Sequence, residues 1–227
     1  MSPVYIHNAS SWEEADAHFA AFMATVPERR VELAQRVAET GGPVLDRSVD
    51  SLLAVNEWFI EQALDRPDAP DVQHRPAWMS PPNPDFEPNW LNPRPPAGWL
   101  DLLWEQVSVY VGDVFITAVP GSRWVCWRSR TKSHIDNGWP AIDIGAAPDI
   151  KGNAIMIANA GVLRSWTHQG TGDRDDVRPD PTDMHTRLRG VLRSREEYLA
   201  EHPMRWQAAP TGPKAHRRVT GAAPPPD

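Results

Sequence analysis

The chain has 227 residues, 41 % of them hydrophobic, and a formal net charge of −7 from 30 acidic and 23 basic residues. This length suits one domain, and so acidic a chain repels a phosphate backbone, which argues against nucleic-acid binding. The single cysteine excludes an internal disulfide bond, and neither a membrane-spanning apolar run nor a secretion signal is recognisable, so we expect a cytoplasmic protein with cationic or neutral partners.

Three helices are predicted in the N-terminal part of the chain. Residues 11–14, SWEE, form a capping box that begins a helix ending near residue 24. Pro27 suits the first turn of a second helix, which the glycines at 41–42 end. Apolar residues at intervals of three and four predict a third helix over about 46–64.

Residues 65–97 differ in composition from the rest of the chain. Ten prolines fall between Pro67 and Pro96, and proline both lacks a backbone N–H and disfavours helix in the residue before it. The segment also carries large apolar side chains, namely Trp78, Met79, Phe86, Trp90 and Leu91. We therefore expect an irregular segment that crosses the surface of the domain and is held there by these side chains.

A hairpin is predicted after a fourth helix over about 98–111, which Gly112 ends. Strands are expected over 113–119 and 123–129, joined by a Pro-Gly-Ser turn, with a further strand over 140–144. Apolar residues lie on both faces of this hairpin, so we expect both faces to be covered.

The remaining chain predicts two helices, over 153–166 and 183–202, separated by a polar loop. Residues 203–227 are rich in proline and basic, and we expect them to form a mobile tail. These elements predict a single α+β domain over residues 1–202. A short antiparallel sheet over about 113–144 is flanked by helices, and the proline-rich segment crosses the domain.

One stretch of the chain, residues 98–166, resembles a known class of domain. A helix is followed by VGDVFITAVPGSRWVCW, then by GWPAIDIG and NAIMIANAGVLRSW. This order is similar to that of small bacterial α+β domains of unknown function, some of which resemble immunity proteins of bacterial toxin systems. The resemblance rests on packing motifs, so it implies a fold and a protein-binding role of the immunity type, but no catalytic residue.

Cys126 with His134 and Asp136 is the strongest catalytic candidate, because a thiol nucleophile needs a base and the base needs an orienting carboxylate. These residues would make the protein a small hydrolase or transferase. The competing interpretation is structural. Cys126 lies between Val125 and Trp127 in an apolar strand, where a buried cysteine behaves as a small hydrophobe. We favour the structural interpretation.

No metal or cofactor site is predicted. His134 and Asp136, with Asp143 or His168, offer too few well-placed ligands for zinc, and the glycine motifs that bind nucleotides are absent.

Aromatic side chains are the remaining candidates for function, because aromatic anchors dominate binding energy. We predict a binding surface of four aromatic and four acidic residues: Trp78, Phe86, Trp90 and Trp139, with Asp136, Asp173, Asp175 and Asp176. The alternative is that the tryptophans only seal the proline-rich segment onto the core. The leading hypothesis is a non-enzymatic binding protein with a cationic protein partner and no cofactor.

Overall fold

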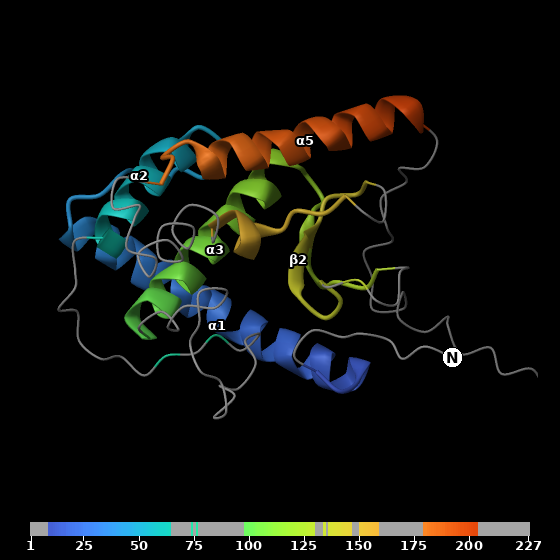
Figure 1. Cartoon of the computed structure of the whole chain (residues 1–227), viewed down its shortest axis with the longest axis horizontal. Coiled ribbons are helices and arrows are strands. Elements are labelled where there is room, and N and C mark those ends of the chain that lie inside the picture. Colours follow the sequence, from blue (N-terminus) through green and yellow to red (C-terminus); the bar gives the residue numbers. More distant parts are fainter. Residues whose placement is uncertain are drawn as a thin grey trace, which may run out of the picture.

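Helix α3 (Gly98–Ala118) is the centre of the fold, and the other elements pack around it (Figure 1). The structure, a computed structural model, describes residues 9–64, 74, 76, 98–129, 134, 136–146, 150–158 and 179–203. Within these residues α3 is buried along almost its whole length, and the chain combines helices with a two-stranded antiparallel sheet. The predicted α+β class with a short sheet is therefore confirmed.

In the described part of the chain, other helices and both strands pack around α3. Both α1 (Trp12–Glu39) and α2 (Ser51–Leu64) contact α3, and α5 (Asp183–Glu201) packs on α2. The strands are β1 (Arg123–Cys126) and β2 (Pro140–Asp143), and they pack against the C-terminal half of α3. The apolar residues of all these elements form one core cluster, whose largest fully buried side chains include Phe22, Phe59 and Phe115.

Helix α1 runs without a break through Pro27, so the prediction of two separate helices here is wrong. Proline removes one backbone hydrogen bond from a helix interior, and tertiary packing on both sides of it can offset this loss. The predicted N-terminus is confirmed, since the backbone N–H of Glu14 donates to Ser11 Oγ at 3.2 Å. The buried face continues before and after the proline through Ala15, Phe22, Val26, Arg29, Leu33 and Val37.

Helix α2 ends at residue 64 as predicted, but it begins at Ser51 rather than near residue 46. The backbone N–H of Ser48 donates to Asp46 Oδ1 at 2.8 Å, and the N–H of Ser51 donates to Ser48 Oγ at 3.1 Å. Short polar side chains that accept from the backbone in this way favour a turn and then a helix N-terminus. The residues before 51 therefore form the turn that precedes the helix.

The predicted strand over 113–119 is wrong. Residues 113–118 are the last turns of α3, and Gly112 lies inside the helix rather than at its end. Residues 113–115 are buried and the run has only Asp113 and Thr117 as polar residues, so periodicity alone cannot distinguish it from a buried strand. The Pro-Gly turn at 120–121 is present, but it connects α3 to β1 instead of joining two strands.

The strands predicted near residues 123 and 140 are confirmed, and they pair with each other. Trp124 is buried, whereas Val125, Cys126 and Trp127 are only partly buried. The expectation that both faces of the sheet are covered therefore holds for β2, where Pro140, Ala141 and Ile142 are all buried, but only in part for β1. The antiparallel register joins Arg123 to Asp143, Trp124 to Ile142, Val125 to Ala141 and Cys126 to Pro140.

Two predicted helices of the C-terminal part can be compared with the structure. Residues 154–158 are helical, and Asn153 Oδ1 accepts from the backbone N–H of Met156 at 3.1 Å, as expected for the start of the helix predicted over 153–166. The rest of that helix lies outside the described residues. Helix α5 confirms the prediction over 183–202 and buries Met184 and Leu188. The predicted tail lies outside the described residues from 204 onwards.

The proline-rich segment is described only at residues 74 and 76. His74 Nε2 lies 2.7 Å from Glu105 Oε2 on α3, and Pro76 is buried. The segment therefore contacts the central helix at this point. No helix in the described part of the chain is both long and apolar enough to cross a membrane.

Candidate functional site

The described residues include only some of those that the sequence singled out. Cys126, His134, Asp136 and Trp139 are described, and all four lie in or near the loop between β1 and β2. The remaining candidates lie outside the described residues, and their role stays a prediction: they are Trp78, Phe86, Trp90, Asp173, Asp175 and Asp176.

Cys126 is half-buried at the end of β1, and its thiol donates to the backbone carbonyl of Gly138 across 3.8 Å. Burial, and then the nearby carboxylate of Asp16, raises the pKa of this thiol to about 11. The thiolate is the form that acts as a nucleophile, so this shift makes Cys126 a weaker nucleophile at neutral pH than an ordinary cysteine. This supports the structural interpretation of the cysteine.

His134 and Asp136 have other partners. Nδ1 of His134 accepts from the backbone N–H of Asp136 at 3.2 Å, while the carboxylate of Asp136 forms an ion pair with Lys151 Nζ at 2.7 Å. In the described part of the chain, no hydrogen bond or ion pair joins Cys126 to His134. The side chains are thus not arranged as a nucleophile, a base and an orienting carboxylate.

The tryptophans of the sheet region pack against other residues. The ring of Trp124 contacts Phe22 edge to face at a centroid distance of 5.0 Å, and Trp139 packs against the core cluster. Lys151 Nζ lies 4.6 Å from the ring centroid of Trp127. Burial lowers the pKa of Lys151, against the effect of Asp136.

Sequence reasoning missed a buried ionic network between α1 and α3. Arg29 Nε donates to Glu105 Oε2 at 2.8 Å, and the Glu105 side chain is 1 % exposed. Arg29 also pairs with Glu32, which accepts from Gln106 Nε2 at 3.0 Å, and His74 joins the network at Glu105. The signal that could have revealed it is the polar pair Glu105-Gln106 in the middle of an otherwise apolar run.

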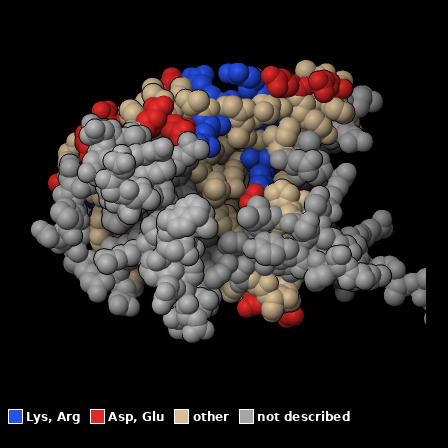
Figure 2. Space-filling model, viewed as in Figure 1, with Lys and Arg blue, Asp and Glu red and all other residues tan. Residues whose placement is uncertain are grey.

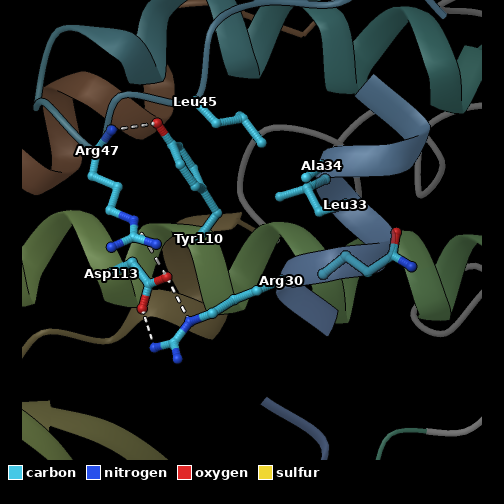
Figure 3. A pocket seen from close by; sticks show the side chains of 8 residues that line it. Arg30, Leu33, Ala34, Leu45, Arg47, Tyr110 and Asp113 are labelled. Carbon is cyan, nitrogen blue, oxygen red and sulfur yellow. Dashed lines mark hydrogen bonds and ion pairs between the residues drawn. The ribbon is translucent and has the colours of Figure 1, made fainter. Parts of the chain in front are cut away.

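A pocket of about 140 Å³ opens between α1, α3 and the loop that joins α1 to α2 (Figure 3). Three of its residues follow one stripe of α3 and three follow one stripe of α1, so the two helix faces oppose each other across it. Its apolar groups are Leu33, Ala34, Leu45 and the ring of Tyr110, and its polar groups are Arg30, Arg47, Gln106 and Asp113.

Two arginine side chains converge on Asp113 from different elements (Figure 3). Arg30 of α1 donates from Nε and Nη2 to the two carboxylate oxygens at 2.8 and 2.6 Å. Nε of Arg47, from the loop, lies 4.0 Å from Asp113 Oδ2. The hydrogen bonds to Asp113 raise the pKa of Arg30. Two cationic side chains, those of Arg30 and Arg47, therefore face the single carboxylate of Asp113 in this pocket.

The backbone of Arg47 has φ of 61°, in the left-handed region that non-glycine residues rarely adopt. Its N–H donates to the hydroxyl of Tyr110 at 3.1 Å, and that hydroxyl lies 2.7 Å from Ser51 Oγ. Because the single hydroxyl proton of Ser51 goes to Ser48 O, Tyr110 is the donor to Ser51. This chain of hydrogen bonds fixes the loop on α3.

The outer face of α1 is exposed and combines small apolar residues with carboxylates. The helix has 28 residues and is therefore about 42 Å long. Val31 is 67 % exposed on this face. The other exposed residues of the face are Glu13, Asp16, Ala17, Ala20, Ala21, Ala24, Pro27, Glu28, Ala34, Gln35, Ala38 and Glu39.

No family model matches the sequence, and neither a curated protein nor a solved structure matches the chain. In the part of the chain that the structure describes, no group of three or more histidine, cysteine, aspartate or glutamate side chains is placed to hold a metal ion. The candidate sites are therefore the pocket and the outer face of α1.

Proposed function

We propose that the chain is a non-enzymatic, cytoplasmic binding protein that docks a cationic protein on the outer face of α1. The observation that carries the proposal is the way in which the charges of α1 are sorted. Glu13, Asp16, Glu28 and Glu39 are exposed, while Arg29 and Arg30 pair with carboxylates of α3. The result is a long helix face on which the charged residues of α1 are carboxylates and the other polar residue is Gln35.

The ion pairs of α1 explain this sorting. Arg29 is buried against Glu105, and Arg30 is held by both oxygens of Asp113. The outward carboxylates differ in their partners: Asp16 is paired with Arg128 Nη2 at 2.6 Å, whereas the Glu28 side chain is 66 % exposed and lies 3.9 Å from Arg29. Surface ion pairs of this kind contribute little, so a cationic partner can take over such a carboxylate at small cost.

Small side chains on the same face suit a close approach by a partner helix. Alanines recur on this face from Ala17 to Ala24 and again at Ala34 and Ala38, and Val31, between the two groups, adds a larger apolar side chain. Helices pack about 8–10 Å apart, at the shorter end where the contact residues are small. We expect the partner to present a helix whose apolar stripe meets the alanines and whose lysines or arginines meet the carboxylates.

Helix α5 is a poorer surface for a cationic partner because it carries both signs. Figure 2 shows blue basic groups over the middle of this helix and red acidic groups toward one end. These are the exposed residues Arg187, Arg189, Arg193, Glu196, Glu197 and Glu201. Because its charges are mixed, α5 matches a cationic partner less well than the outer face of α1 does.

The narrowest form of the proposal is an immunity-type role. In that case the cationic partner is a toxin protein, and the chain blocks it by covering its active surface. The resemblance of residues 98–166 to small bacterial α+β domains motivates this form, and the identity of the captured partner tests it.

The test compares capture of proteins from a lysate of the source cells by the full chain and by two double variants. Ala20→Arg/Ala24→Arg places bulk and positive charge on the outer face of α1. Ser194→Arg/Ala200→Arg makes the same charge change on the exposed face of α5, and arginine is a good helix former in both helices.

We expect the wild-type chain and the α5 variant to retain the same basic protein at low ionic strength, and salt to release it. The α1 variant should lose it. The proposal fails if no protein is retained at low salt, or if the α1 variant retains it as well as the wild-type chain does.

A further inference from the structure

We propose that the pocket between α1, α3 and the loop that joins α1 to α2 binds a small organic carboxylate whose apolar body is about the size of a benzene ring. This site is separate from the α1 docking face proposed above, and it rests on different residues apart from Ala34, which is exposed on α1 and also lines the pocket.

The charge of the pocket favours an anion. Arg30 donates two hydrogen bonds to the buried carboxylate of Asp113, whose side chain is 6 % exposed. Arg47 has only the 4.0 Å approach to the same carboxylate among the described residues, and its side chain is 57 % exposed. Its terminal Nη groups are therefore open to a ligand, and a guanidinium group binds a carboxylate through two parallel hydrogen bonds.

The size and the apolar wall of the pocket define the rest of the ligand. Leu33, Leu45 and the ring of Tyr110 form apolar surface beside the arginines (Figure 3). The volume of about 140 Å³ is close to that of an apolar cavity of about 150 Å³ that holds benzene. Gln106 is buried in the wall, and its Oε1 has no hydrogen-bond partner in the described part of the chain.

The loop holds Arg47 in place before any ligand arrives. Its left-handed backbone is retained by the hydrogen bond from its N–H to Tyr110, which in turn is tied to Ser51. Non-glycine residues in this conformation cost stability, and they occur where the surrounding structure imposes them, often at binding sites. Here the imposed conformation directs a cation to the edge of an apolar pocket.

Isothermal titration of the full chain with three ring-sized probes tests the charge preference. Benzoate is the anion, benzyl alcohol the neutral probe and benzylamine the cation. We expect saturable binding of benzoate at least about tenfold tighter than of the other two, the effect of one charge-assisted pair. Equal binding of the three probes, or no saturable binding of benzoate, would overturn the proposal.

Variants locate the binding. Arg47→Gly removes the guanidinium group while keeping a residue that adopts φ of 61° freely, and Ala34→Leu fills the pocket from an exposed position of α1. Both should weaken benzoate binding about tenfold or more, whereas Arg193→Gln, which removes one positive charge from α5, should not change it. Full retention of affinity in Arg47→Gly would exclude this site even if benzoate binds. The Arg47→Gly result does not bear on the capture of a protein by α1, because Arg47 is not part of the α1 face.

Discussion

The ring of Trp124 in β1 lies directly on the backbone of Gly112 in α3. A Cβ atom added at position 112 would lie 2.1 Å from Cζ2 of Trp124 and 2.8 Å from Cε2, too close for the ring to remain where it is. The glycine therefore allows the sheet to approach the central helix. It also explains why a residue of low helix propensity lies in the interior of α3.

Replacing this glycine should destabilise the fold. Gly112→Ala gains up to about 1 kcal/mol of helix propensity, but forcing the buried ring aside costs about 1–3 kcal/mol, so we expect a net loss of stability. Gly190→Ala in α5 is the matched control, since an added Cβ there meets nothing within 4 Å. It should stabilise the protein by up to about 1 kcal/mol. Urea unfolding of both variants measures the two effects, and equal gains would contradict the argument.

The burial of α3 shows why the sequence predicted some elements of the fold correctly and this helix end incorrectly. Helices with a polar face, such as α5, have a periodicity that marks them clearly, and a capping box at Ser11 marked the start of α1. Residues 113–118 contain only two polar residues, Asp113 and Thr117, so their apolar run was assigned to a strand. Gly112 was assigned to a helix end because only the structure shows that it accommodates Trp124.

Candidate sites were harder to predict than elements. Cys126, His134 and Asp136 are close in sequence, but in the structure Asp136 forms an ion pair with Lys151, and burial raises the pKa of the Cys126 thiol. The pocket, by contrast, joins residues 30, 47 and 113, and pairs between such distant positions are set by helix packing, which no local pattern encodes. A polar residue within an apolar helix, such as Glu105, was the one available sign of a buried partner.

The ion pair of Arg29 with Glu105 should be costly to break on one side only. Removing one partner of a buried pair leaves an uncompensated charge and costs about 3–5 kcal/mol, whereas replacing both partners by apolar residues is often close to neutral. We expect Glu105→Leu and Arg29→Met each to destabilise the chain strongly, and the double variant to lose clearly less than the sum. A double-mutant cycle by urea unfolding measures this coupling. Additive losses would show that the pair is not coupled.

The thiol of Cys126 should be protected in the native protein. Burial and Asp16 raise its pKa from 9.0 to about 11, which lowers the thiolate fraction about a hundredfold at pH 8 and below. We expect Ellman's reagent at pH 8 to label the native chain at least about tenfold more slowly than the urea-unfolded chain. Labelling of the native chain at the unfolded rate would revive the catalytic interpretation of Cys126, His134 and Asp136.

Acid should destabilise the α1–α3 interface through Glu32. Burial alone would raise the pKa of this carboxyl group, but the hydrogen bonds from Gln106 and Arg29 outweigh burial and hold the pKa below its usual value of 4.5. A carboxyl group whose pKa is lower in the folded than in the unfolded state contributes stability above the unfolded pKa and loses it as the pH falls through the folded pKa. The free energy of unfolding should therefore fall as the pH decreases below about 4.5.

The variant Glu32→Gln isolates this contribution. It cannot titrate, so the difference between its urea midpoints at pH 6.5 and pH 3.5 should be smaller than in the wild-type chain. Glu57→Gln removes an exposed carboxylate from α2 and serves as the control for the change in net charge. If both variants show the same acid sensitivity, the hydrogen bonds to Glu32 do not contribute to stability above pH 4.5, and the acid effect has its origin in the net charge of the chain.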